Sequence, residues 1–111
     1  MINVDSALIE QVLINLLLNA MDAVKEVADP QIKISAEVNN QKVLIKISDN
    51  GLGIPNELLD KIFIPFFSTK KTGNGIGLSL CKQVMMLHRG QITVQSVENE
   101  GSIFNLTFDL I

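Results

Sequence analysis

Two asparagines one helical turn apart are the residues of this chain whose type and spacing most directly suggest chemistry. Asn15 and Asn19 lie in an otherwise mostly apolar segment, IEQVLINLLLNAMDAV, although asparagine is a mediocre helix former. At this spacing in a helix, both amides project from one face. Two glycine-rich loops follow, DNGLGIP at 49–55 and GNGIGL at 73–78. An oxygen-bearing helix face beside two such loops predicts a site for a nucleotide and its metal ion.

Hydrophobic periodicity predicts the elements that must position these residues. Between residues 5 and 27, apolar residues recur at the spacing of an amphipathic helix, with Asp5 or Ser6 as N-cap and Asp29-Pro30 as the break. Helices interleaved with antiparallel hairpins predict one α+β domain, built as a two-layer sandwich. The other expected elements are strands at 32–38 and 43–47 joined by a tight turn at Asn39-Asn40, a short helix at 55–59, a helix at 76–87 stopped by Gly90, and strands at 92–97 and 103–110.

Composition limits the class of protein. At 111 residues the chain suits a single domain with a real core. The formal net charge is −3 and no run of Lys or Arg occurs, so we expect no nucleic-acid partner. Cys81 is the only cysteine, and its apolar helical surroundings predict a buried structural thiol and fit a reducing compartment. We also expect no bilayer-spanning stretch and no signal peptide, while a membrane-bound parent protein stays open.

Four motifs in a fixed order carry a family resemblance. They are N-x-x-x-N at 15–19, D-x-G-x-G at 49–53, F-x-P-F at 63–66 and G-x-G-x-G-L at 73–78. With the closing H-R-G-x-I and G-S-x-F segments, this order resembles the ATP-binding domain of sensor histidine kinases, which shares its fold with DNA gyrase, the Hsp90 chaperones and MutL. The resemblance spans about residues 5–108. It implies the Bergerat fold, a mixed, mainly antiparallel sheet with helices on one face, and ATP and Mg²⁺ as ligands.

The resemblance implies that the asparagine helix holds the metal and the phosphates. Asn19 matches the residue that binds Mg²⁺ through its side-chain oxygen, the ligand type that a hard cation prefers. Asn15 would face the phosphates and the metal-bound waters, and Asp22 belongs to the same ATP-binding face. The alternative is that these are solvated polar positions on an amphipathic helix.

The first glycine loop resembles the part of the family that recognises the base. Asp49 matches the aspartate that accepts a hydrogen bond from the exocyclic amine of adenine, which disfavours guanine because guanine presents an acceptor there. Gly51 and Gly53 let the backbone turn and approach the base, and Ile54 completes this group. The alternative is a plain Asp-Asn-Gly turn after a strand.

The second half of the site resembles a phosphate-binding lid. Phe63 opens the F box, FIPFF, and Lys70 or its neighbour Lys71 would reach a phosphate as a point charge. The alternative for each lysine is a solvated surface position. We expect 68–74 to be the least ordered internal stretch without nucleotide and to become ordered with ATP. A Rossmann loop would need a strand immediately upstream, and a P-loop would need G-K-S or G-K-T. The remaining expected ATP-binding residues are Gly73, Gly75, Ile76, Gly77, Leu78 and Ser102.

The residue at position 15 separates two reaction types. Gyrase-like ATPases have a glutamate there as a general base for water, whereas Asn15 cannot take a proton near neutral pH. The resemblance therefore implies transfer of the γ-phosphoryl group to a protein histidine, which depends mainly on positioning and charge neutralisation. His88, the only histidine, matches a structural position at a helix end. The acceptor is expected on a separate dimeric helical hairpin, which this chain lacks.

We therefore expect residues 1–111 to be one histidine kinase-type ATP-binding domain, shortened at its N-terminal strand and nearly inert alone. Its expected partners are the phosphoacceptor hairpin of the same parent kinase and a response regulator. The isolated domain should be monomeric, and the parent kinase cytoplasmic or anchored in the inner membrane. Two alternatives stay open: a non-catalytic nucleotide-binding module, and an ATPase or chaperone relative.

Overall fold

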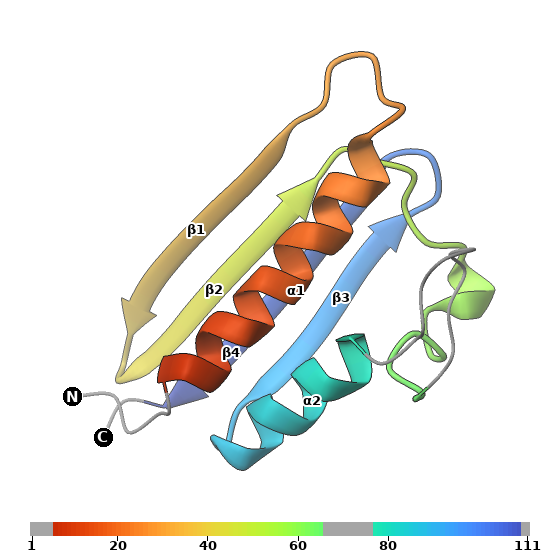
Figure 1. Ribbon diagram of the computed structural model, residues 1–111. Helices are drawn as coiled ribbons and strands as arrows, with labels where there is room; N and C mark the ends of the chain where they lie inside the picture. Colours follow the sequence, from red (N-terminus) through yellow and green to blue (C-terminus); the bar gives the residue numbers. More distant parts are fainter. Residues whose placement is uncertain (1–5, 66–76, 110–111) are drawn as a thin grey trace.

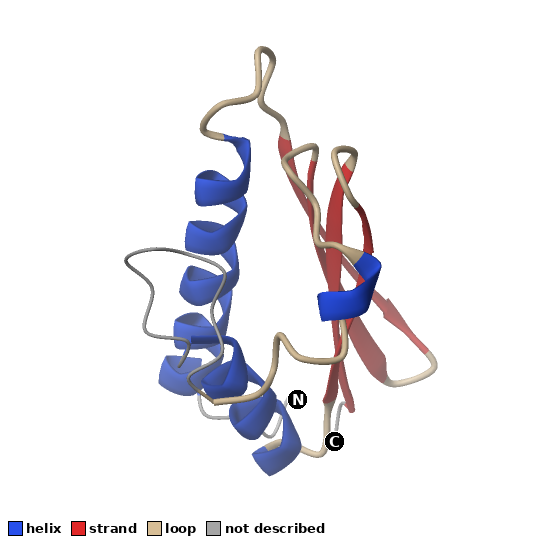
Figure 2. Cartoon of the chain, turned by 90° about the vertical axis from the view of Figure 1, so that its right-hand side faces the viewer, coloured by secondary structure: helices blue, strands red, loops and turns tan. Residues whose placement is uncertain are grey.

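The chain forms one sheet with its helices on a single face. The computed structural model describes residues 6–65 and 77–109 (Figure 1). Figure 2 shows the long helices on one side of the sheet, and no long helix among the described residues on the other. The predicted α+β, two-layer architecture is therefore confirmed. The elements are α1 (Ser6–Val24), β1 (Ile32–Asn39), β2 (Lys42–Asp49), the 3₁₀ helix η1 (Asn56–Leu58), α2 (Gly77–Leu87), β3 (Gln91–Val97) and β4 (Gly101–Asp109).

The sheet has the strand order β1-β2-β4-β3, and each neighbouring pair is antiparallel. The parallel component of the expected mixed sheet is therefore not found among the described residues. Because successive side chains of a strand point to opposite faces, the register decides which residues meet the helices. Ile47 stands opposite Ile34 on β1 and Phe104 on β4, which defines the helix-facing side.

The core lies between α1, α2 and the helix-facing side of the sheet. The helical spacing places Ile9, Val12, Leu16 and Ala20 on one face of α1, and all four are buried. Burying a side chain of this kind contributes about 1.5–3 kcal/mol for a Val, Leu or Ile. The core is completed by Val43, Ile47, Ile62, Cys81, Val84, Met85, Ile92, Phe104, Leu106 and Phe108.

The first helix ends three residues earlier than its sequence predicts. In a continuing helix the Ala23 carbonyl would accept the N–H of Val27. Instead it accepts the N–H of Leu52 at 3.2 Å, and Val27 donates to the Val24 carbonyl at 2.9 Å, in a tighter turn. The partner that ends the helix therefore comes from the loop after β2, far along the chain.

Two turns differ from the prediction by one residue. Asn39 is the last residue of β1, so the hairpin turn consists of Asn40 and Gln41, with φ of 54° and 66°. Positive φ at both central residues is the geometry of the two-residue hairpin turn that matches strand twist. At the end of α2, Arg89 rather than Gly90 takes the positive φ, 57°, and the Gly90 N–H donates to the Met85 carbonyl at 2.7 Å.

The expectation that no stretch could span a bilayer is wrong by length and composition. Residues Ala7–Val24 of α1 form an 18-residue apolar helix that meets both criteria. One face of this helix packs on the sheet, and several apolar residues on its other sides are exposed, among them Ile14, Leu18 and Met21. The core helix of a globular domain passes the same test, so this finding alone assigns no membrane segment.

The edge strand β1 lies outside the cover of the helices. α1 runs over the middle of the sheet (Figure 1), and among the described strands β1 pairs with β2 alone. Its helix-facing side chains are consequently exposed, with 56% of Ile34 and 63% of Val38 accessible to solvent. The strand therefore contributes hydrogen bonds to the sheet but little to the core.

Candidate functional site

The polar residues of α1 begin beside the start of α2, at Asn15. Asn15, Asn19 and Asp22 are each half-buried, and their spacing places them on one side of the helix. Asn15 lies close to the first residue of α2, since a Cβ placed on Gly77 would be 3.9 Å from both Cγ and Oδ1 of Asn15. The structure thus brings the first asparagine to the N-terminal end of α2, the helix that begins within the glycine-rich segment 73–78.

Asp49 ends β2 on the helix-facing side of the sheet. In the register it stands opposite Ile32 on β1 and Ser102 on β4, and its Oδ1 accepts the Gly51 N–H at 2.9 Å. Burial raises the pKa of the Asp49 carboxyl, while the backbone N–H groups of Gly51 and Ser102 act in the opposite direction. The net shift is upward, so the site holds a partly desolvated carboxylate.

As the pH falls, the wild-type domain should become more stable relative to the Asp49→Asn variant. Because the folded-state pKa of Asp49 is raised above its usual value of 3.8, the folded protein takes up the proton more readily than the unfolded chain. The free energy of unfolding of the wild type, minus that of Asp49→Asn, should therefore increase as the pH falls through the folded pKa. The increase should be complete once the pH is below 3.8, the usual pKa of this carboxyl group. Urea unfolding of both proteins across this range measures it, and a difference that is constant or that decreases would contradict it.

The loop after β2 lies tightly between α1 and the β3–β4 hairpin. Gly51 is buried, and a Cβ there would collide with the backbone of Ala23 in the last turn of α1. Gly53 has φ +69°, and its Cβ would collide with the Val97 carbonyl. Both glycines are thus required by close backbone approach, and at Gly53 also by conformation. The loop is held in one place beside Asp49.

A pair of serines anchors the same loop, the predicted Ser102 and Ser96, which the sequence analysis missed. Ser96 Oγ accepts the Ile54 N–H at 2.7 Å and donates to the Gly101 carbonyl at 2.9 Å. Its distance to Ser102 Oγ is 2.8 Å, and since its own hydrogen is used, Ser102 is the donor of this bond. The sequence signal that could have identified Ser96 was its position in β3: it takes the next helix-facing place after the apolar Ile92 and Val94.

Asn50 is a second residue that the sequence analysis did not assign to the site. Its Oδ1 accepts the Gln31 N–H and its Nδ2 donates to the Asp29 carbonyl, both at 2.8 Å. The Asn50 N–H also donates to the Gln31 carbonyl at 3.2 Å. This side chain fastens the α1–β1 connection to the loop that follows Asp49, so it supports the site without facing it.

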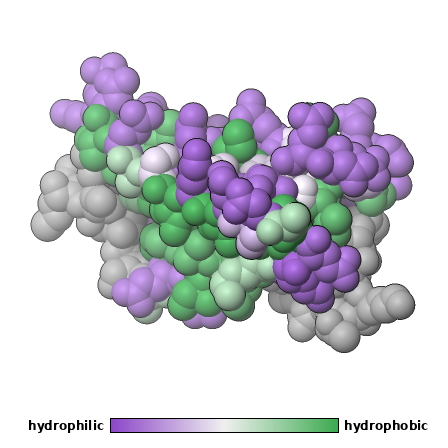
Figure 3. All heavy atoms as spheres, turned by 90° about the horizontal axis from the view of Figure 1, so that it is seen from above, coloured by the Kyte–Doolittle hydropathy of each residue, from purple (hydrophilic) through white to green (hydrophobic). Residues whose placement is uncertain are grey.

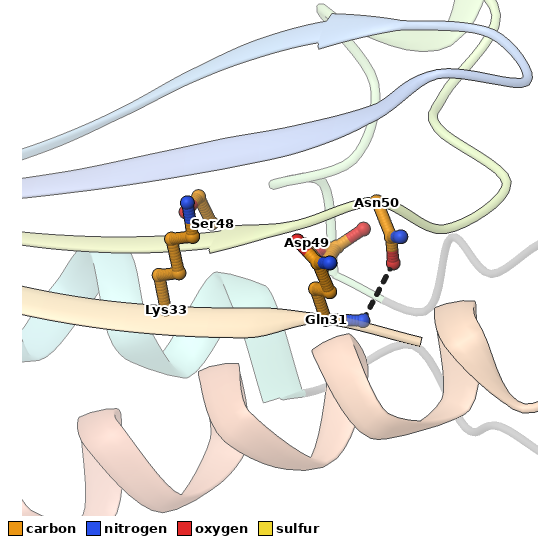
Figure 4. Close-up of a pocket in the computed structure, with 5 residues that line it drawn as sticks. All are labelled: Gln31, Lys33, Ser48, Asp49 and Asn50. Carbon is orange, nitrogen blue, oxygen red and sulfur yellow. Dashed lines mark hydrogen bonds between the residues drawn. The ribbon is translucent and has the colours of Figure 1, made fainter. Parts of the chain in front are cut away.

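Figure 4 shows a small hollow beside the site. It has a volume of about 150 Å³ and is lined by Gln31, Lys33, Ser48, Asp49 and Asn50. Lys33 and Ser48 stand opposite each other and point to the outer face of the sheet, because their neighbours Ile32 and Asp49 point to the helices. Pockets for small molecules usually exceed roughly 300 Å³. The hollow adjoins the candidate site but does not correspond to a nucleotide pocket.

Phe63, which precedes the glycine-rich loop at 73–78 in the sequence, packs against α2. Phe63 and Leu78 are partly buried against the core, and the Lys82 Nζ lies 5.7 Å from the centre of the Phe63 ring, at cation–π distance. Seen from above, hydrophobic surface lies between groups of hydrophilic residues (Figure 3).

Five predicted site residues and the expected lid at 68–74 lie outside the described residues: Lys70, Lys71, Gly73, Gly75 and Ile76.

The lone histidine is engaged at the end of α2. His88 Nδ1 lies 2.7 Å from the Val84 carbonyl, and because a carbonyl only accepts, the ring must donate from Nδ1. This arrangement agrees with the structural role expected from the sequence.

Helix α1 connects the two groups of candidate residues. Its Ala23 contacts the glycine loop beside Asp49, and its Asn15 contacts the start of α2. Eight residues of helix separate these points by about 12 Å, with Asn19 halfway. Along α1, the candidate site therefore has the Asp49 carboxylate at one end and the N-terminus of α2 at the other. The amide side chains of α1 lie between them.

Comparisons with known proteins agree with this geometry. Residues 4–111 match the family described as histidine kinase-, DNA gyrase B- and HSP90-like ATPases. The chain is 42% identical over 106 residues to the signal transduction histidine-protein kinase AtoS of Escherichia coli K12, covering 95% of this chain and 17% of AtoS. It is 35% identical over 99 residues to sporulation kinase D of Bacillus subtilis 168, covering 89% of this chain and 19% of that kinase.

Solved structures give the same result. The nucleotide-free catalytic domain of the histidine kinase ThkA superposes with a TM-score of 0.83 at 40% identity, covering 96% of this chain and 68% of that one. The mycobacterial sensor histidine kinase MprB has the same fold, with a TM-score of 0.85 at 22% identity, over 97% of this chain and 76% of that one. The chain spans about a fifth of the length of the two curated kinases. It therefore belongs to the family of histidine kinase-, DNA gyrase B- and HSP90-like ATPases, as an ATP-binding catalytic domain of the histidine kinase type.

Proposed function

We propose that this domain binds ATP with Mg²⁺ and donates the γ-phosphoryl group to a histidine on a separate helical hairpin of its parent kinase. One observation carries the proposal: α1 joins the corner at Asp49 to the N-terminus of α2 through a stripe of amide side chains. An elongated ligand with a base at one end and phosphates at the other matches this arrangement.

The base is proposed to bind at the corner formed by β2, β4 and the glycine loop. Asp49 accepts a hydrogen bond from the exocyclic amine of adenine, and its carboxylate offers nothing to the carbonyl of guanine. Gly51, Gly53 and Ile54 form the wall that the rigid loop supplies. Ser102 offers an acceptor oxygen, because its hydrogen is directed to Ser96.

The metal is proposed to bind beside Asn19, with Asn15 and Asp22 on the same face of α1. In the part of the chain that the structure describes, no group of three His, Cys, Asp or Glu residues could hold a metal ion. A site with one amide oxygen, phosphate oxygens and waters suits Mg²⁺, which keeps several waters when bound. When bound, the ion would neutralise charge on the phosphates. Gly77 and Leu78, with Phe63, Lys70, Lys71, Gly73, Gly75 and Ile76, are proposed to complete the phosphate end.

The chain supplies no base at position 15, so the proposed acceptor is a nucleophile in its own right. An imidazole nitrogen attacks the γ-phosphorus, the N–P bond forms, and the bond to the bridging oxygen breaks as ADP leaves. The task of the domain is then to bind, orient and shield the phosphates. A response regulator is the proposed next recipient, and the cytoplasm the proposed location, since ATP is the donor.

Calorimetric titration tests the proposal directly. The domain should bind ATP and ADP more tightly than GTP, and Mg²⁺ should strengthen ATP binding. Asn19→Ala should remove most of the difference between titrations with Mg²⁺ and with EDTA, whereas Asn105→Ala, on the outer face of β4, should retain it. Equal affinity for ATP and GTP would contradict the role of Asp49. An unchanged Mg²⁺ dependence in Asn19→Ala would return Asn19 to a solvated polar position.

A further inference from the structure

One of the two Asn-Gly pairs in the sequence lies in the loop that follows β2. This pair is Asn50-Gly51, and the other, at 74–75, lies outside the described residues. Asparagine before glycine is the pair most prone to spontaneous deamidation, because glycine has no side chain to hinder attack by its backbone nitrogen. Neither ATP nor Mg²⁺ takes part in this chemistry, so it is independent of the proposed function.

Deamidation needs only the chain itself and water. The Gly51 amide nitrogen loses its proton and attacks Cγ of Asn50, and a new N–C bond forms. The Cγ–Nδ2 bond then breaks, and the Nδ2 group takes up a proton and leaves as ammonia. Water opens the resulting succinimide at either of its two carbonyls, which gives aspartate or isoaspartate at position 50.

The two ends of the Asn50 carboxamide are both held by the connection between α1 and β1. Its Oδ1 accepts the Gln31 N–H and its Nδ2 donates to the Asp29 carbonyl, each at 2.8 Å, and Figure 4 shows the first of these bonds. Both bonds oppose the reaction, because Cγ must be free to meet the Gly51 nitrogen and Nδ2 must leave. The Asn50 N–H also donates to the Gln31 carbonyl at 3.2 Å, which fixes the backbone beside the side chain.

The attacking nitrogen is held as well. The Gly51 N–H donates to Oδ1 of Asp49 at 2.9 Å, and a nearby carboxylate disfavours the negative charge that loss of this proton would leave on nitrogen. Gly51 is also buried against the last turn of α1, where a Cβ would collide with the Ala23 carbonyl. The nucleophile and the amide that it would attack are thus fixed by different parts of the fold.

We propose that Asn50-Gly51 is a conditional deamidation site, closed in the folded loop and reactive when the loop detaches from the α1–β1 connection. The products cannot restore the lost contacts. A carboxylate has no N–H for the Asp29 carbonyl, and its new negative charge lies next to Asp49. Isoaspartate also lengthens the backbone by one atom, directly before a glycine that is closely packed. Deamidation therefore converts a transient opening of the loop into permanent loss of its anchor.

The rates of deamidation in the folded and the unfolded wild-type domain test whether the fold closes this site. Both samples are kept at the same mildly alkaline pH, one in buffer and one in guanidinium chloride, and conversion at Asn50 is measured by peptide mass spectrometry. Conversion should be about four- to a hundredfold slower in the folded domain, because each of the two hydrogen bonds of the Asn50 side chain should lower the open fraction by about two- to tenfold. Equal rates in the two samples would overturn the proposal.

Two variants separate opening of the loop from unfolding of the whole domain. Ser96→Ala removes the oxygen that accepts the Ile54 N–H at 2.7 Å, so the loop should open more often, and Asn50 should deamidate about two- to tenfold faster in the folded domain. Val84→Ala is the matched control, because it removes buried atoms from the core on α2 and leaves the hydrogen bonds of the loop in place. A rate that is unchanged in Ser96→Ala, or raised equally in both variants, would contradict opening of the loop as the route.

Asn50→Asp tests the consequence of the modification, because it reproduces the aspartate product. It should lower the urea concentration at which half of the domain is unfolded. Asn105→Asp adds the same charge on the outer face of β4 and should leave this midpoint close to the wild-type value. A wild-type midpoint in Asn50→Asp would show that the Asn50 amide is not an anchor of the loop, and would overturn the proposal.

Discussion

With ATP labelled at the γ-phosphate, the domain alone should remain unlabelled and release little phosphate, whereas a phosphoacceptor hairpin of its parent kinase added in trans should become labelled. The difference should be close to all or none, because the chain has Asn15 where a general base would activate water. Its only histidine is engaged at the end of α2, where Nδ1 of His88 donates to the Val84 carbonyl. Gel autoradiography and released phosphate measure the two outcomes.

Two controls make this result specific to the hairpin. A hairpin whose acceptor histidine is replaced by glutamine should stay unlabelled, and His88→Gln in the domain should leave labelling of the wild-type hairpin intact. Label on His88, or brisk phosphate release by the domain alone, would show that the proposed reaction is wrong.

Asp49→Asn should reduce ATP affinity by about ten- to a hundredfold, which is the range for loss of a hydrogen bond to a charged group. The amide places an N–H₂ group where the carboxylate has only acceptors. Weak binding of GTP should change much less, so that the preference for adenine largely disappears. Calorimetric titrations of both nucleotides against the variant measure this ratio.

Asp109→Asn provides the matched control for this substitution. It changes a carboxylate to an amide on the same sheet, where Asp109 forms an exposed ion pair with Lys42 at 2.8 Å. Exposed pairs of this kind contribute about 0–1 kcal/mol, so ATP affinity should remain at the wild-type level. ATP binding by Asp49→Asn equal to that of the wild type would contradict the proposed contact with the base.

The elements with strong local patterns could be predicted from the sequence, and the residues that depend on distant partners could not. The core face of α1 and the alternation in β2 and β4 follow from spacing alone. The end of α1 does not, because Ala23 is capped by Leu52, which only the folded chain brings near. The same holds for the turn at Asn40 and Gln41, where propensity favours two asparagines but the strand register selects the next pair.

The candidate site divides in the same way. Asp49, Gly51 and Gly53 form a local motif, so their types and spacing suffice to identify them. Ser96 and Asn50 act across strands and loops, and their roles depend on a register that the sequence does not state. Asn15 was identified from its spacing, but its closeness to the start of α2 depends on how the two helices pack, which the sequence does not state.

Within residues 6–65 and 77–109, no strand pairs with the outer edge of β1, and this has a practical consequence for measurements on the domain. An uncovered edge strand with exposed apolar side chains is a template for intermolecular strand addition, and β1 contains neither proline nor a bulge among its eight residues. Self-association through this edge should grow with protein concentration. Measurements that need concentrated protein should therefore be accompanied by a dilution series, which shows whether the domain self-associates.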